Sequence, residues 1–425
     1  MKKLTAVVLT FLMLIVIGGS FMACGNRDKT VVNDGDDYIV ATYYFPNWGS
    51  QNKDKVFNPS TDSEWGSIMN ALPKFEGHQQ PKVPVWGYED AADPAVMAKK
   101  IEQARTNGID TFIFDWYWFR EIRAGGKATG LYLEAELERG FLKAENTNDL
   151  DFALMWCNHD VGTDLKANIT PEEFDVMTDY IIENYFTKPN AFRVDGNLYF
   201  SIYQMDNFVD MFKNEFGMTD IKLAKAALEN FRQKVRDAGL GELHLNCMVW
   251  GAKNIDATGA WPGGIPPLNF NAMDYLGVDS TTSYVWAHDV WPGSTLSVDY
   301  QPWSEKAVEK TAMMMNDTID YDIPYYPNLT MGWDPSPRCD QTVEYDPNKG
   351  YPFTPIVYNN TPENFKNAAL KIREIMDNAE MKNKILTVNS WNEWGEGSYL
   401  EPDDVNGYGY LWAIKEVFGT KHREI

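Results

Sequence analysis

The amino-acid sequence predicts an α/β protein that folds as a (β/α)8 TIM barrel with a long insertion after the first strand. Short apolar or alternating runs recur eight times along the 425 residues. Helix start and stop signals lie between most of these runs, and strands that alternate with helices pair in parallel. The first run leads into Pro46-Asn47-Trp48 rather than into a glycine-rich turn, which disfavours the alternative of an open doubly wound sheet.

The eight runs have the lengths that are usual for strands. They are residues 38–45, 111–117, 151–157, 197–203, 243–250, 277–284, 323–329 and 384–390. Four connecting helices have clear start signals, in which an Asp or Thr capping residue precedes the first helical residue and, in three of them, is followed directly by Pro. These helices start at Asp93-Pro94, Thr170-Pro171, Asp220 and Thr361-Pro362. The insertion spans residues 46–92, and we expect an extra strand or a lid element at 83–88.

The first residues predict a targeting signal rather than part of the folded domain. Lys2 and Lys3 precede an apolar stretch, and a small residue precedes Cys24, as in the lipidation signals of bacterial lipoproteins. We therefore expect a signal peptide at 1–23, a lipidated tether at 24–37 and a catalytic barrel domain at 38–425. The expected location is an exported protein anchored through Cys24 to a bacterial membrane, on the outer-membrane, periplasmic or cell-surface face. A plain secreted protein and an uncleaved anchor are the alternatives.

The charge of the chain excludes some classes of partner, and its cysteine and histidine content argues against disulfides and metal sites. The chain has 38 basic and 61 acidic residues and a net charge of -23, which argues against nucleic acid and against an anionic membrane surface. Cys157, Cys247 and Cys339 are an odd number in an exported protein, so we expect buried thiols rather than a disulfide framework. The five His are scattered and no CxxC occurs, so no metal and no cofactor is expected. The sequence does not predict the oligomeric state.

Aromatic residues lie at the carboxyl ends of all eight runs. The chain contains 15 Trp, 22 Tyr and 22 Phe, and the carboxyl ends of barrel strands build active sites. A single ring is equally well explained as a core residue. Rings at every end, with amides and carboxylates between them, favour a carbohydrate, which has apolar C–H faces and hydroxyls that need partners. The candidate substrate-binding residues are Tyr43, Tyr44, Trp48, Asp115, Trp116, Trp118, Asn158, His159, Tyr203, Trp250, Trp286, Trp333, Trp391, Asn392 and Glu401.

His78, in the insertion, is a further candidate, and pinning of the long loop is its alternative role. Glu393 and Glu396 are the candidate catalytic pair. Glycoside hydrolysis uses two carboxyl groups, and a spacing of three in a turn aims both at one cavity. Most Glu-x-x-Glu pairs are solvated surface, but this one lies between Trp391, Trp394 and Gly397.

Five long motifs resemble the WbsX-like proteins, which are related to glycoside hydrolase family 99. They are YYFPNW (43–48), FEGHQQPK (75–82), PVWGYEDAADP (84–94), GIDTFIFDWYWF (108–119) and SWNEWGEGSYLEPD (390–403). The resemblance covers roughly residues 38–415 and implies a (β/α)8 barrel. It implies that Glu393 and Glu396 are the catalytic pair and that Tyr44 and Trp116 line the sugar site.

The resemblance also implies a mechanism, because family 99 is similar to retaining endo-α-mannosidases. Glu393 would deprotonate the substrate 2-hydroxyl, which acts as the internal nucleophile, and Glu396 would protonate the leaving group and then activate water. The endo-mannosidases commonly have His where this chain has Gly395, and this departure argues against mannan or N-glycan specificity but not against the catalytic pair. Two alternatives stay open: a glycosyltransferase of WbsX type and a non-catalytic glycan-binding lipoprotein. A transferase would need a cradle for a diphosphate, and the strand ends carry few basic residues.

Overall fold

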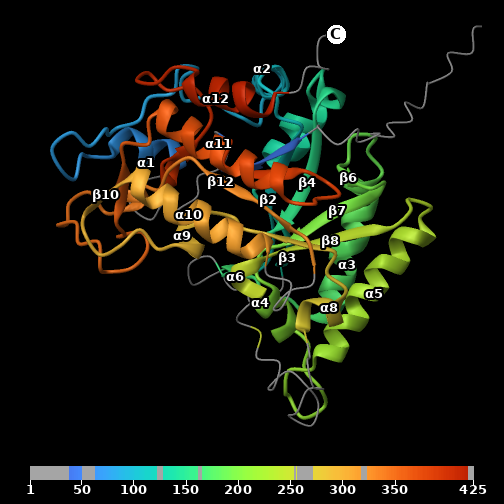
Figure 1. Cartoon of the computed structure of the whole chain (residues 1–425). Coiled ribbons are helices and arrows are strands. Elements are labelled where there is room, and N and C mark those ends of the chain that lie inside the picture. Colours follow the sequence, from blue (N-terminus) through green and yellow to red (C-terminus); the bar gives the residue numbers. More distant parts are fainter. Residues whose placement is uncertain are drawn as a thin grey trace, which may run out of the picture. The chain divides into compact units, whose positions relative to one another are not determined.

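Parallel strands form the barrel that the sequence predicts. The computed structural model describes residues 38–49, 63–121, 128–160, 165–252, 255, 271–316 and 323–419, all within one compact unit, Asp34–Ile425 (Figure 1). The barrel strands are β1 (Ile39–Tyr44), β2 (Thr111–Glu121), β4 (Asp151–Trp156), β7 (Asn197–Ile202), β8 (Leu243–Met248), β9 (Ser280–Thr282), β11 (Tyr325–Tyr326), β12 (Asn328–Thr330) and β14 (Ile385–Asn389). Their order in the sheet is β11-β9-β8-β7-β4-β2-β1-β14-β12.

The seventh predicted strand is divided into β11 and β12 by Pro327. Strand β11 pairs with β9, and β12 pairs with β14, so the two ends of the sheet meet at this proline. Proline has no N–H for a strand ladder, but the Pro327 carbonyl accepts a 2.9 Å hydrogen bond from the Thr387 N–H. The barrel is therefore nearly closed, and the predicted fold class is confirmed.

Short strands extend this sheet or lie outside it. Strand β2 continues past the barrel and pairs in antiparallel fashion with β3 and β5, while β6 pairs with β7. The additional strands are β3 (Ala128–Tyr132), β5 (Leu165–Lys166), β6 (Arg193–Val194), β10 (Ser297–Asp299), β13 (Ile356–Tyr358), β15 (Asn392–Glu393) and β16 (Ser398–Tyr399). Strand β10 pairs with β13, and β15 with β16.

Helices connect the barrel strands and cover them. The α-helices are α1 (Glu64–Asn70), α2 (Pro94–Thr106), α3 (Pro171–Ile181), α4 (Met205–Asp210), α5 (Ile221–Asp237), α6 (Val249–Ala252), α8 (Ala272–Leu276), α9 (Trp286–Asp289), α10 (Tyr300–Met315), α11 (Pro362–Asn378) and α12 (Gly409–Phe418). The π-turns are η1 (Glu136–Gly140) and η4 (Ile182–Phe186), and the 3₁₀ turns are η2 (Phe141–Lys143), η3 (Thr147–Asp149), η5 (Ser336–Arg338) and η6 (Trp394–Glu396). Helices α10, α11 and α12, orange to red in Figure 1, lie side by side.

The predicted helix starts are confirmed by their caps. The side chains of Asp93, Thr170, Asp220 and Thr361 each accept a hydrogen bond from a backbone N–H of the first turn. Thr170 also forms the predicted capping box with Glu173. These caps satisfy donors that a helix start otherwise leaves without partners.

The insertion after β1 differs from its prediction in one respect. Residues 83–88 are not a strand: one antiparallel bridge joins Pro84 to Asp403, and the Val85 N–H donates to the Pro402 carbonyl at 2.8 Å. The segment therefore docks on the residues that follow β16. Cys157, Cys247 and Cys339 are all buried free thiols, as expected.

The predicted signal peptide (1–23) and tether (24–37), including Cys24, lie outside the described residues. Among the residues that are described, no helix is long and apolar enough to cross a membrane.

Candidate active site

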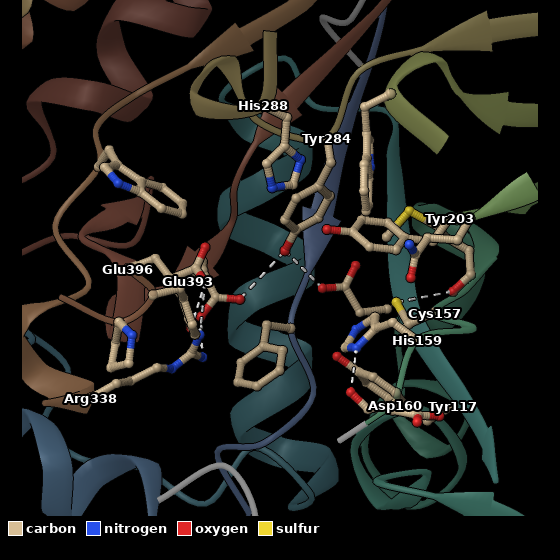
Figure 2. Close-up of a pocket in the computed structure, with 18 residues that line it drawn as sticks. Tyr117, Cys157, His159, Asp160, Tyr203, Tyr284, His288, Arg338, Glu393 and Glu396 are labelled. Atoms are coloured by element: carbon tan, nitrogen blue, oxygen red, sulfur yellow. Dashed lines mark hydrogen bonds and ion pairs between the residues drawn. The ribbon is translucent and has the colours of Figure 1, made fainter. Parts of the chain in front are cut away.

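A cavity of about 640 Å³ opens at the carboxyl ends of the barrel strands. Figure 2 shows Glu393, Glu396 and Arg338 on one side of the cavity and Tyr203, His159 and Tyr117 on the other. It is lined by Phe45, Asp115, Tyr117, Met155, Cys157, His159, Asp160, Tyr203, Gln204, Trp250, Tyr284, His288, Trp333, Arg338, Tyr351, Pro352, Glu393 and Glu396. A cavity of this size, apolar with a few convergent polar groups, is typical of a small-molecule site.

Glu393 and Glu396 stand on a tight hairpin that follows β14. Glu393 ends β15, which pairs with β16, and the 3₁₀ turn η6 between these strands ends with Glu396. Side chains three apart in a 3₁₀ turn lie one above the other, so both carboxyl groups point into the same cavity. Gly397 closes the turn in the left-handed region at φ 65°, where glycine has no steric cost.

Three contacts fix this hairpin. The Asn392 amide bonds both to the N–H and to the carbonyl of Phe45, at 2.8 and 3.0 Å, and so ties the hairpin to the end of β1. Trp394 stacks on Tyr399 with 3.7 Å between ring centroids and donates to Glu401 at 2.8 Å. Asn392 and Glu401 therefore hold the hairpin that carries Glu393 and Glu396 from behind rather than lining the cavity.

Arg338 binds both candidate catalytic carboxylates at once. Its Nη2 lies 2.7 Å from Glu393 Oε1, and its Nη1 lies 2.9 Å from Glu396 Oε1. The same guanidinium contacts Glu64 at 3.2 Å and the Tyr351 hydroxyl at 2.6 Å. Figure 2 shows the Arg338 side chain reaching both carboxylates from one side of the cavity. Arg338 thus fixes the relative position of the pair.

Burial and mutual repulsion perturb these charges. Burial raises the pKa of Glu393 well above its ordinary value, Arg338 opposes this, and the neighbouring carboxylates add to it. Burial likewise raises the pKa of Glu396, against Arg338 and Tyr351. Burial alone would lower the pKa of Arg338, but the acidic groups around it raise that pKa well above its ordinary value. A cluster with more carboxyl groups than cations favours the retention of a proton, which a general acid requires.

Gly395 leaves the space that Arg338 occupies. A Cβ added at Gly395 would lie 2.7 Å from Arg338 Nε and 3.0 Å from its Cζ. The endo-mannosidases commonly have His at the position of Gly395. In this chain the Arg338 guanidinium occupies the space that a side chain at position 395 would need.

We expect Gly395→Ala to lower the free energy of unfolding by about 1–3 kcal/mol, because the guanidinium cannot move without breaking its ion pairs. The turnover of substrate should fall as well. Gly130→Ala is the matched control, since a Cβ there meets nothing within 4 Å, and it should change stability by less than about 0.5 kcal/mol. Equal denaturation midpoints for the two variants would show that Arg338 is not packed in this way.

Asp115 and Tyr284 face the pair from the other side. The Tyr284 hydroxyl donates to Asp115 Oδ2 at 2.9 Å and lies 3.5 Å from Glu393 Oε2. Burial raises the pKa of Asp115 well above its ordinary value, against the hydrogen bond from Tyr284. A third carboxyl group therefore belongs to the same cluster.

Aromatic rings line the remaining wall. Tyr203 packs edge-on against both Trp250 and Tyr284, at 5.4 and 5.5 Å between centroids. His288 lies beside Trp250. Burial lowers the pKa of His159, so the His159 imidazole is neutral near physiological pH and adds a polar group to the wall without adding a cation.

Of the predicted site residues, the structure brings seven to this cavity: Asp115, His159, Tyr203, Trp250, Trp333, Glu393 and Glu396. The others lie outside it, and strand alternation explains two of them, Trp116 and Trp118. Successive strand side chains face opposite sides, so Asp115 and Tyr117 line the cavity while Trp116 and Trp118 face away. Trp116 donates to the Tyr185 hydroxyl at 3.3 Å and stacks with Trp118.

The remaining candidates have structural partners. The Tyr43 hydroxyl donates to the Ser283 carbonyl at 3.1 Å, and the Asn158 amide bonds to both backbone groups of Gln204. Trp286 donates to the Asn328 carbonyl at 2.9 Å. Trp391 packs against Phe112 with 4.9 Å between centroids.

Two of these candidates share a buried carboxyl group. Glu136 accepts from the Tyr44 hydroxyl at 2.8 Å and from the Trp48 N–H. Tyr44 and Trp116, which the family resemblance placed at the sugar, therefore lie behind the wall of the cavity.

His78 lines a different cavity. Its Nε2 lies 2.8 Å from Asp334 Oδ2, which also accepts from Gln80 at 2.7 Å. His78 thus pins the insertion to the loop that precedes Arg338, which is the second of its two expected roles.

Several cavity residues were absent from the candidates. They are Phe45, Tyr117, Met155, Cys157, Asp160, Gln204, Tyr284, His288, Arg338, Tyr351 and Pro352. The alternation of β2 and β4 carried the signal for Tyr117, Met155 and Cys157. Arg338 and Tyr351 come from loops whose course the sequence does not predict.

Comparison with known proteins assigns the family. The profile of the Glycosyltransferase WbsX family matches residues 40–414. The chain belongs to this family. The "Uncharacterized protein WxcX" from two strains of Xanthomonas campestris pv. campestris is 26% identical over 392 residues, which are 89% of this chain and 49% of each relative. The chain thus spans about half the length of these curated relatives.

Solved structures support the fold. A "Glycoside hydrolase-like protein" is similar with a TM-score of 0.52 at 17% identity, covering 91% of this chain and 95% of the other. The GH99 endo-alpha-mannosidase from Bacteroides thetaiotaomicron is similar with a TM-score of 0.51 at 14% identity, covering 89% and 95%. These likenesses support the barrel fold. Among the described residues, no cluster of His, Cys, Asp or Glu has the arrangement of a metal site.

Proposed function

We propose that this WbsX-family chain is a glycoside hydrolase that acts on a glycan or polysaccharide. The observation that carries the proposal is the convergence of Glu393 and Glu396 on one cavity, held by a single Arg338 and facing a wall of aromatic rings. Buried carboxyl groups with raised pKa values supply an acid and a base, and aromatic rings bind the apolar faces of sugars. The fold likeness to glycoside hydrolases supports the same class of reaction.

We infer a retaining mechanism with two carboxyl groups and participation of the 2-hydroxyl. Glu393 takes the proton of the 2-hydroxyl while that oxygen attacks the anomeric carbon, and Glu396 gives its proton to the departing glycosidic oxygen. The product of this first step is a 1,2-anhydro sugar. Glu396 then removes a proton from water, which attacks the anomeric carbon and opens the three-membered ring, and Glu393 returns its proton to the 2-oxygen. Each carboxyl group ends in its starting state, as a catalyst must.

The family name makes a glycosyltransferase the second candidate. A sugar nucleotide carries a diphosphate, which a site binds with cations or with several aimed N–H donors. Among the residues that line the cavity, Arg338 is the single Lys or Arg, and acidic or phenolic partners already occupy its guanidinium. This charge balance favours a neutral glycan over a sugar nucleotide.

Incubation of the purified chain with a panel of polysaccharides and glycans tests the proposal. A glycosidase releases new reducing ends without any nucleotide sugar. Thermal-shift measurements with nucleotide sugars, with and without divalent metal, run in parallel. Binding of a nucleotide sugar without any release of reducing ends would favour the transferase, and glycan binding with neither result would favour a non-catalytic lipoprotein.

Tyr351 provides a pH test of the role of Glu396. Its hydroxyl donates to Glu396 Oε1 at 2.9 Å and so lowers the pKa of that carboxyl group. Tyr351→Phe should therefore raise the pKa of Glu396. Because the general acid must be protonated, the alkaline limb of the rate profile should move to higher pH, while kcat at the optimum changes by less than about tenfold. An alkaline limb that stays in place, or moves to lower pH, would contradict Glu396 as the acid.

We further propose that the chain is exported and anchored through a lipid on Cys24, as its first residues predict. Metabolic labelling with a radioactive fatty acid tests the anchor, and Cys24→Ala should abolish the label and release the protein from membranes. Persistent labelling of this variant would reject Cys24 as the lipidation site.

A further inference from the structure

We propose that Asp115 and Glu393 share one proton across the Tyr284 hydroxyl and that Asp115 holds it, so that Glu393 remains the ionised base. This inference rests on the proposed glycosidase function for its purpose, although its protonation test needs no substrate. Asp115 is then a positioning residue that acts through Glu393. It does not bind the sugar as a carboxylate.

The geometry of Tyr284 implies a shared proton. Its hydroxyl lies 2.9 Å from Asp115 Oδ2 and 3.5 Å from Glu393 Oε2. A phenol has one hydrogen to donate, so it cannot satisfy two carboxylates at the same time. Two buried anions beside one donor repel each other, and one of them takes up a proton instead.

The surroundings decide which group takes the proton. Arg338 lies 2.7 Å from Glu393, and a cation at this distance favours the ionised carboxylate. No ion pair of Asp115 occurs among the described residues, its exposed fraction is 2%, and its Oδ1 has no hydrogen-bond partner there. An ionised Asp115 would be a buried charge supported by a single hydrogen bond, so the proton belongs on Asp115.

The other titratable groups near Asp115 do not change this assignment. Arg338 and Glu396 act on it across the cavity with opposite signs. The remaining neighbours are phenols and a thiol whose pKa values burial raises, and they stay neutral: Tyr43, Tyr117, Cys157, Tyr203 and Tyr284. The local charge is therefore set by the carboxyl groups and Arg338.

Infrared spectra of the full chain at neutral pH measure the proton directly, because a protonated carboxyl group has a C=O band separate from carboxylate bands. Wild type should show such a band that is missing in Asp115→Asn. Burial raises the pKa of Glu136 to about 8, and the proposed general acid Glu396 carries a proton at rest. These two groups contribute further bands, which Glu136→Gln and Glu396→Gln identify. Identical protonated-carboxyl bands in wild type and in folded Asp115→Asn would overturn the proposal.

Kinetics provide the second readout. Asparagine keeps the neutral shape and the acceptor for Tyr284, so Asp115→Asn should keep kcat within about threefold of wild type, whereas Asp115→Ala should lose at least about tenfold. If Asp115→Asn is as inactive as Asp115→Ala while both keep native circular dichroism, Asp115 acts as an anion and the proposal is wrong. If wild type hydrolyses no glycan, the proposed function fails, and the infrared result still decides where the proton lies.

Discussion

Glu393→Gln should lower kcat by about 10²–10⁴-fold, because the variant loses the base that accepts the 2-hydroxyl proton. Sugar binding should persist, since glutamine has nearly the same shape and the aromatic wall is unchanged. Stability should not fall, because the substitution removes a buried group whose pKa burial raises. Initial rates and calorimetric binding to the same glycan measure the two effects separately.

Glu242→Gln is the matched control for this substitution. Glu242 forms a half-exposed ion pair with Arg236 and is not among the cavity residues. Its neutralisation should leave kcat and KM unchanged. A Glu393→Gln variant that keeps the rate of the Glu242→Gln control would remove Glu393 from the catalytic pair.

Arg338→Met should be the most destabilising single substitution proposed for this chain. The Arg338 side chain is 7% exposed and faces Glu64, Glu393 and Glu396. Removal of one partner from a buried ionic cluster leaves uncompensated charge, which costs about 3–5 kcal/mol. Activity should be lost too, because the two carboxyl groups lose their common anchor. Chemical denaturation at several pH values measures the stability.

The pH dependence of this loss follows from the carboxyl groups. Their pKa values are already raised by burial, and removal of Arg338 raises them further. The contribution of Arg338 is present while the carboxylates are ionised and is lost as they protonate. The deficit should therefore be largest at neutral and alkaline pH and should shrink on acidification. Arg236→Met, which breaks an exposed pair, should cost less than about 1 kcal/mol at every pH. A deficit for Arg338→Met that is equally small would refute its role as the anchor.

The fold could be predicted from the sequence because its signals are local. Each barrel strand is a short buried run, and the helices at Asp93, Thr170, Asp220 and Thr361 begin with caps that the structure confirms. The exception is the division of the seventh strand, where Pro327 cannot donate to a ladder although β11 and β12 still bridge β9 and β14. Closure of the barrel is a long-range property that no local pattern contains.

The site was predicted less completely than the fold. The spacing of Glu393 and Glu396 and their flanking tryptophans are local features of the sequence, and the structure places both side chains at one cavity. The indole rings of Trp116 and Trp118 suggest a sugar site, but the alternation of β2 turns Asp115 and Tyr117 toward the cavity and these two rings away from it. Arg338 could not be found in this way, because its place beside Glu393 depends on how two loops far apart in the sequence meet.

Nuclear magnetic resonance of the products that form first from a susceptible glycan tests the central claim most directly. In ¹⁸O-labelled water, a retaining hydrolysis by Glu393 and Glu396 predicts a new reducing end that carries the label, with the anomeric configuration of the substrate. The same sample with Glu393→Gln should show intact glycan. An inverted anomer would contradict the retaining mechanism, and a labelled product formed equally by wild type and by Glu393→Gln would contradict the catalytic pair itself.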